Sequence, residues 1–147
     1  MTPKIHAAAG GLALITIATF WSGTLLVEVI GTHSQIGWVK TAVLWGMLVL
    51  IPAMATAGAS GAVLAKRMKG PLIAVKQRRM KFIAANGLLI LLPSAVFLAL
   101  RASTGHFDAI FYTVQTVELL AGAANITLLS LNMRDGLALR NRRQKAL

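Results

Sequence analysis

The side chains of this chain that could do chemistry include two histidines in short polar stretches between long apolar segments. His33 follows Glu28 closely in the sequence, and His106 immediately precedes the Phe107–Asp108 dipeptide. Two histidines on one side of a membrane can ligate a haem b iron axially. Together with carboxylates, they can instead hold zinc, copper or non-haem iron. We therefore predict haem b binding by His33 and His106, or a metal site of Glu28, His33, His106 and Asp108. The alternative is that both histidines are ordinary solvated residues.

A second candidate site comes from the last apolar segment. Residues three or four positions apart share one face of a helix. One such face carries the strongly polar side chains inside this segment, and its polar members are Asp108, Gln115, Glu118, Asn125 and Asn132. Lipid cannot satisfy these groups, so the face is expected to point into a helix bundle. Glu118 lies about 15 Å along the helix from Asp108, at ~1.5 Å per residue, which places a carboxyl near the bilayer centre.

Glu118 has two interpretations that the sequence leaves open. A carboxyl inside a membrane is costly and is by default a hypothesis for a functional site. Glu118, with Gln115 and Asn125 beside it, could exchange a proton or a cation during transport. It could equally be a protonated acid that bonds Gln115 or Asn125 and holds helices together.

The elements that must position these residues are four apolar runs. They cover approximately residues 6–30, 37–65, 80–101 and 108–132. Each run exceeds the ~20 residues that a helix needs to cross a bilayer. Runs this continuous indicate helices rather than barrel strands, because a lipid-exposed backbone must satisfy its own hydrogen bonds. We expect an all-α integral membrane protein with one transmembrane domain over residues 1–147.

The lengths of the connections predict how these helices are arranged. Residues 31–36 and 102–107 form two short connections, and helices joined so tightly pack as antiparallel neighbours. The third connection, from Lys66 to Arg79, is longer and is expected to be a surface segment. The result is an up-down-up-down bundle in which Glu28 and Lys40 lie at the same outer boundary. We expect these two residues to form an ion pair.

The distribution of positive charge predicts the orientation of the bundle. Of the 15 Lys and Arg residues, only Lys40 and Arg101 lie in the two short connections or at their borders; the rest lie at the N-terminus, in the central connection or near the C-terminus. This is the positive-inside pattern, and it places both termini in the cytoplasm. We expect a multi-pass protein of a bacterial-type inner membrane. Anionic lipid headgroups account for the net charge of +11 without a nucleic-acid partner.

The function that this pattern favours is a small haem b or metal-binding module for electron transfer. One alternative is a proton- or cation-coupled small transporter that uses Glu118. Another is an accessory or assembly subunit, in which small residues at helical spacing pack against a larger membrane complex or a second copy. The chain has no cysteine, which excludes thiolate ligands and thiol chemistry. No phosphate loop, metalloprotease motif or dinucleotide fingerprint occurs, so the sequence indicates no enzyme class.

Overall fold

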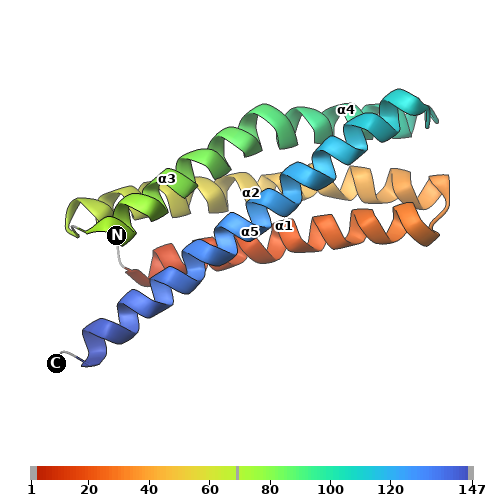
Figure 1. Cartoon of the computed structure of the whole chain (residues 1–147). Helices are drawn as coiled ribbons and strands as arrows, with labels where there is room; N and C mark the ends of the chain where they lie inside the picture. The colour runs from red at the N-terminus through yellow and green to blue at the C-terminus, as the bar shows by residue number, and fades with distance from the viewer. Residues whose placement is uncertain (1–2, 69, 146–147) are drawn as a thin grey trace.

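The computed structural model describes residues 3–68 and 70–145, with side chains up to residue 141. It is all-α. The helices are α1 (Pro3–Ile30), α2 (His33–Lys66), α3 (Pro71–Asn86), a π-helical turn η1 (Gly87–Leu91), α4 (Leu92–Ser103) and α5 (Ala109–Lys145). α3, η1 and α4 follow one another as a single continuous rod (Figure 1). Within the described residues there are thus four rods, and each is long and apolar enough to span a membrane.

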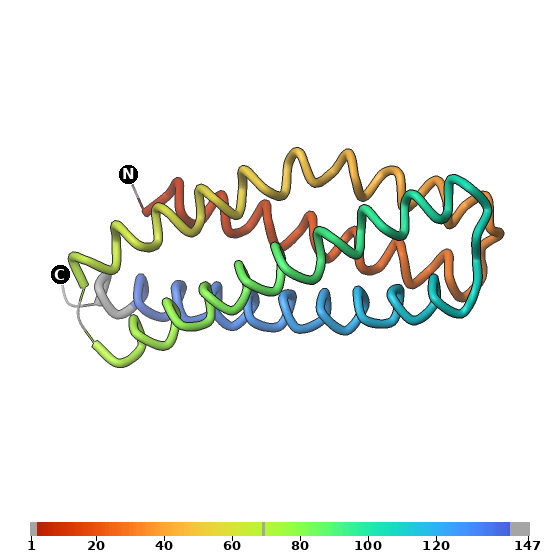
Figure 2. Tube along the Cα trace, turned by 90° about the horizontal axis from the view of Figure 1, so that it is seen from above, coloured from red at the N-terminus to blue at the C-terminus, as the bar shows by residue number. Residues whose placement is uncertain are grey.

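The four rods form an up-down-up-down bundle. α1 packs against α2 and α5, and the third rod packs against the same two helices. The start of α1, the end of α2, the start of α3 and the end of α5 lie at one end of the bundle, which we call the terminal end (Figure 2). The α1–α2 and α4–α5 connections lie at the other end, which we call the hairpin end. The predicted bundle and its antiparallel neighbours are therefore confirmed.

Local sequence explains where α2 and α3 begin. The Thr32 side chain accepts from the Gln35 backbone while the Gln35 side chain accepts from the Thr32 backbone, so the two form a capping box. α2 therefore starts at His33, earlier than expected. α3 starts at Pro71, directly after Gly70, whose φ of 144° suits a glycine. Much of the expected connection from Lys66 to Arg79 is therefore helical. The fixed φ of a proline suits the first turn of a helix, and α3 continues from it.

The π-helical turn lies just before Pro93. The backbone N–H of Leu92 reaches back to the carbonyl of Gly87, one residue further than in an α-helix. Proline lacks an N–H, and its ring clashes with the carbonyl four residues earlier. A local π-turn widens the helix and gives that ring room. The third rod therefore stays continuous through Pro93 to Ser103.

Two apolar clusters form the core. One fills the middle of the bundle, and its buried members are Ala13, Ile17, Leu50, Ala53, Ile83, Leu91 and Leu129. The other lies near the hairpin end and is made of Ile36, Leu98, Ala102 and Phe111. Along both α2 and α5, the residues between these clusters include charged or amide side chains that are buried. That gap in the apolar core is where the candidate site lies.

Candidate functional site

Lys40 and Glu118 form a buried ion pair between α2 and α5. The Lys40 Nζ lies 2.6 Å from the Glu118 Oε2, and the exposed fractions of the two side chains are 0% and 12%. The Gln115 Nε2 donates to the same Glu118 oxygen at 3.3 Å. We call Lys40, Glu118 and Gln115 the charged centre. In it, the ammonium of Lys40 contacts the carboxylate of Glu118, and the neutral amide of Gln115 donates a hydrogen bond to the same carboxylate.

Helix periodicity puts both partners inside the bundle. Lys40 continues the buried face of α2, between Ile36 and Val43. Helical rise places it about 10 Å into α2 from His33, and Glu118 about 14 Å into α5, at ~1.5 Å per residue. The hydrocarbon core of a bilayer is ~30 Å thick. The charged centre therefore lies well inside the bundle, in its hairpin half.

Glu28 has a different environment from the one predicted. Lys40 pairs with Glu118, so the expected Glu28–Lys40 ion pair is wrong. The interior face of α2 directs the lysine across the bundle toward α5, rather than toward the end of α1. The Glu28 Oε1 is buried and has no hydrogen-bond partner among the residues that the structure describes.

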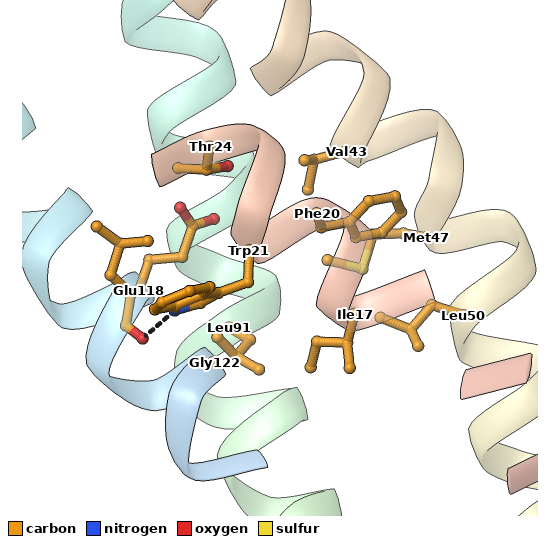
Figure 3. A pocket seen from close by; sticks show the side chains of 11 residues that line it. Ile17, Phe20, Trp21, Thr24, Val43, Met47, Leu50, Leu91, Glu118 and Gly122 are labelled. Atoms are coloured by element: carbon orange, nitrogen blue, oxygen red, sulfur yellow. Dashed lines mark hydrogen bonds between the residues drawn. The ribbon is translucent and has the colours of Figure 1, made fainter. Parts of the chain in front are cut away.

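A small cavity adjoins the charged centre on the side away from the hairpin end. It has a volume of about 40 Å³, room for a few waters at ~10–15 Å³ each. Residues of α1, α2, η1 and α5 line it, and most are apolar: Ile17, Phe20, Trp21, Thr24, Val43, Met47, Leu50, Leu91, Glu118, Leu119 and Gly122. The Glu118 carboxylate points toward the Thr24 hydroxyl (Figure 3). The cavity thus offers its polar groups at one end.

Trp21 closes one side of this cavity. Its indole N–H donates to the Leu119 carbonyl at 2.9 Å (Figure 3). The ring lies against Gly122, where an added Cβ would come within 3.0 Å of the indole. The glycine thus lets the indole approach α5 closely, one turn from Glu118. α1 and α5 are thereby held together beside the charged centre.

The two histidines predicted as ligands lie at the hairpin end and are exposed. The His33 ring stacks on Phe107, with centroids 4.3 Å apart and planes 8° from parallel. The His106 Nδ1 bonds the Thr104 hydroxyl at 2.8 Å. The two connections therefore meet, as expected. However, across residues 3–68 and 70–145 no three His, Asp or Glu side chains gather in a group that could hold a metal ion.

Asp108 immediately precedes α5 and belongs to the same end. Its carboxylate accepts from the Phe111 backbone N–H at 3.0 Å and pairs with Arg101. These two interactions lower the pKa of Asp108 from its ordinary value, the Phe111 hydrogen bond more than the guanidinium. The arrangement explains Asp108 as a helix cap and an ion-pair partner.

The remaining polar residues of the α5 face serve other contacts. Asn125 accepts from the Asn86 amide at 2.8 Å and donates to the Ile83 carbonyl at 3.4 Å. Asn132 accepts from Lys76 through its backbone carbonyl at 3.0 Å. The predicted interior face of α5 is thus found, but Glu118 bonds Gln115 and not Asn125. Asn125 instead joins α5 to the third rod.

Lys40 is the site residue that the sequence analysis missed. The positive-inside rule treated it as a boundary residue. Its spacing to apolar residues of α2 could have identified it, because Ile36, Lys40 and Val43 are four and three positions apart and so share one helix face.

Comparison of the chain with known protein families, with characterised proteins and with solved structures found no match.

Proposed function

We propose that this chain is a small proton- or cation-coupled membrane transporter whose working site is the charged centre. The observation that carries the proposal is the Lys40–Glu118 pair, 2.6 Å apart with the lysine side chain wholly buried. Ionisable residues inside membrane bundles are rare, pair with one another and mark proton and ion pathways. Neutral amides or apolar residues could fill the same space with a smaller desolvation penalty. A charged pair retained at this depth is therefore best explained by a role in moving charge.

The surroundings support this role. The cavity beside Glu118 gives its carboxylate a space that water or a small ligand can enter, with Thr24 opposite. Pro52 within α2 and the π-turn before Pro93 lie on two of the helices that pack around it. Prolines and π-turns are frequent where membrane helices bend or open. These features supply both a charged group and helices that can change shape around it.

The test uses protein reconstituted in lipid vesicles that contain a pH-sensitive dye. A pH gradient and a potassium–valinomycin potential drive protons inward, so the proton itself is the probe. We expect faster acidification than in protein-free vesicles, and loss of the effect in Glu118→Gln. Asp108→Asn is the matched control, because it removes one exposed carboxyl from the same end. Wild-type vesicles no faster than empty ones, or full flux in Glu118→Gln, would reject the proposal. Replacing sodium by choline in parallel samples separates proton flux from sodium coupling.

We also propose the orientation that the basic residues indicate. The terminal end carries most of the Lys and Arg residues, so it lies in the cytoplasm of a bacterial-type inner membrane. The chain contains no cysteine, so single cysteines can be introduced cleanly at exposed Ser34 and Gln77. A membrane-impermeant maleimide added to intact cells should label Ser34→Cys and spare Gln77→Cys. The reverse pattern would invert the orientation. A homodimer or a larger membrane complex remains a prediction that native mass measurements can test.

Haem b at His33 and His106 is the second candidate. What favours it is that the two connections meet through the His33–Phe107 stack. Both imidazoles would supply axial ligands, and both are exposed. An absorption spectrum of the protein purified from haem-replete cells decides the matter. A Soret band that disappears in His33→Ala/His106→Ala would favour haem; a colourless protein would reject it.

A further inference from the structure

Two buried acceptor oxygens beside the charged centre, the Glu28 Oε1 and the Gln115 Oε1, have no hydrogen-bond partner among the described residues. Lys40 matches the charge of Glu118, and Gln115 donates to the same carboxylate. Glu28 adds a second carboxyl without adding a cation, since Lys40 is already paired. Its Oε1 is buried with no hydrogen-bond partner within residues 3–68 and 70–145. Two carboxylates and one ammonium leave a surplus of one negative charge in this half of the bundle.

The side-chain oxygen of Gln115 also lacks a hydrogen-bond donor among the described residues. Its side chain is buried, with 3% of the residue exposed. Its Nε2 points at Glu118, yet its Oε1 is buried and has no donor in the part of the chain that the structure describes. Both atoms belong to one planar amide, so this unsatisfied oxygen lies beside the ion pair. A buried acceptor without a donor is unfavourable and calls for an explanation.

Helix direction brings Glu28 and Gln115 toward the same level. Side chains lean toward the N-terminus of their own helix. α1 runs from the terminal end to the hairpin end, so Glu28 leans inward, toward Thr24 one turn away on the same face. α5 runs the opposite way, so Gln115 leans from deeper in the bundle toward the hairpin end. Two acceptors that lack a donor thus lie on facing helices beside Lys40 and Glu118.

We propose that Glu28 is the proton-binding group of this site, and that its protonated carboxyl donates the hydrogen bond missing at the Gln115 Oε1. A protonated carboxyl has one O–H donor, whereas a carboxylate has none. One added proton removes the surplus charge and supplies the missing donor. The Lys40–Glu118 pair then stays ionised and holds the site in place. This inference rests on the proposed function and changes which carboxyl exchanges the proton.

The charged groups that act on Glu28 come from the two helices packed against α1. They are His33 and Lys40 of α2 and Glu118 of α5. Lys40 is bonded to Glu118, and the His33 ring stacks on Phe107. Glu118 repels a second negative charge on Glu28, whereas the positive charge of Lys40 acts in the opposite direction. A sodium ion could also remove the surplus charge, but the site offers few oxygens to a hard cation, which requires many.

The experiment is infrared spectroscopy of the full chain in lipid, recorded as the pH is raised in H₂O and in D₂O. We expect a carbonyl band of a protonated carboxyl in the wild type, equivalent to one group per chain, which fades with rising pH. Glu28→Gln should lose this band, and it should keep the fold because its amide N–H replaces the carboxyl O–H. Asp108→Asn should keep the band. Gln115→Leu should shift it, because the acceptor is removed.

Each outcome decides for or against the inference. A band that survives in Glu28→Gln overturns it, as does a wild type with no such band. Loss of the band when sodium chloride replaces choline chloride at constant pH would assign the site to sodium and also overturn it. Failure of the proposed function is separate: a band lost in Glu28→Gln, without proton flux in the vesicles, would leave a proton site in a protein that does not transport protons.

Discussion

The two halves of the bundle both bury polar groups between helices, but they satisfy these groups differently. At the middle of the bundle, the Asn86 amide donates to Asn125 and to the Ala121 carbonyl, both at 2.8 Å. Closer to the terminal end, Arg79 pairs with Asp135 at 2.6 Å, with exposed fractions of 21% and 10%. In the hairpin half, the Lys40–Glu118 pair has a wholly buried cation.

The difference separates groups that hold helices together from a group that needs another explanation. Neutral amides join α5 to the third rod at modest cost, which is the usual use of polar residues in membrane bundles. The Arg79 ion pair lies near the end of the helices and retains partial access to water. Lys40, by contrast, is charged and its side chain has no access to water. The charged centre thus differs from the polar contacts elsewhere in this bundle, because its cation is wholly buried away from the ends of the helices.

The largest expected effect comes from removing one member of the deep pair. Lys40→Met leaves Glu118 buried without its cation, which should lower the free energy of unfolding by about 3–5 kcal/mol. The double variant Lys40→Met/Glu118→Leu removes both charges and should recover most of this loss. Unfolding in mixed micelles titrated with dodecyl sulfate measures both. A double variant as unstable as the single one would show that the pair is structural, and would break the comparison.

The matched change in the terminal half should be milder. Arg79→Met leaves Asp135, which is as buried as Glu118, next to Arg134, whose Nε lies 3.4 Å from the Asp135 carboxylate. The remaining carboxylate is therefore partly compensated. A loss equal to that of Lys40→Met would mean that depth does not distinguish the two pairs.

Two glycines of α2 offer the next test. A Cβ on Gly46 would lie 2.0 Å from the Phe20 ring, beside the cavity, whereas a Cβ on Gly58 meets nothing within 4 Å. Gly46→Ala should cost about 1–3 kcal/mol by overpacking. Gly58→Ala should be neutral or stabilising by up to ~1 kcal/mol, because alanine favours a helix. If Gly46→Ala is also neutral, the added methyl group has displaced the Phe20 ring into the cavity beside Glu118. The packing around this cavity would then be looser than in the terminal half.

The Asn86–Asn125 amide contact at the middle of the bundle should contribute less than either change in the hairpin half. Asn125→Leu removes the acceptor of Asn86 and the donor to the Ile83 carbonyl. Interhelical hydrogen bonds in membranes contribute about 0.6 kcal/mol on average and at most about 1.7. We expect a loss in that range, without an effect on proton flux. Loss of flux with an intact fold would extend the functional region from the charged centre to the middle of the bundle.

Much of the fold follows from local rules that act along one helix at a time. Apolar runs of sufficient length predict the four rods, and short connections predict that neighbours are antiparallel. The start of α3 at Pro71 was missed because the basic residues after it suggested a loop. Those side chains are compatible with a helix whose exposed face lies near water and headgroups.

The site was predictable only in part, because it depends on how helices meet. The interior face of α5 identified Glu118 and Gln115, since lipid excludes such groups. The partner of Glu118 depends on the rotation of α2 about its axis. Lys40 shares a helix face with buried apolar residues, which indicates that it is buried. The positive-inside rule instead placed it at the membrane boundary. Glu28 required the structure itself, because only the packed bundle shows that its Oε1 is buried without a hydrogen-bond partner among the described residues.

The smallest expected effect concerns Asp108, which carries the water-exposed ion pair of the hairpin end. Its pKa in the folded protein lies below its ordinary value, so it contributes stability above about pH 4, its pKa when unfolded. That contribution disappears as the pH falls through the lower, folded-state pKa. Asp108→Asn should therefore destabilise the protein slightly at neutral pH, and the difference from wild type should vanish in acid. Because the Arg101 partner is also partly exposed, added salt should shrink this difference further. The penalty of Lys40→Met should resist salt, since its charges lie away from water; an equal salt response in both variants would mean that water reaches the charged centre freely.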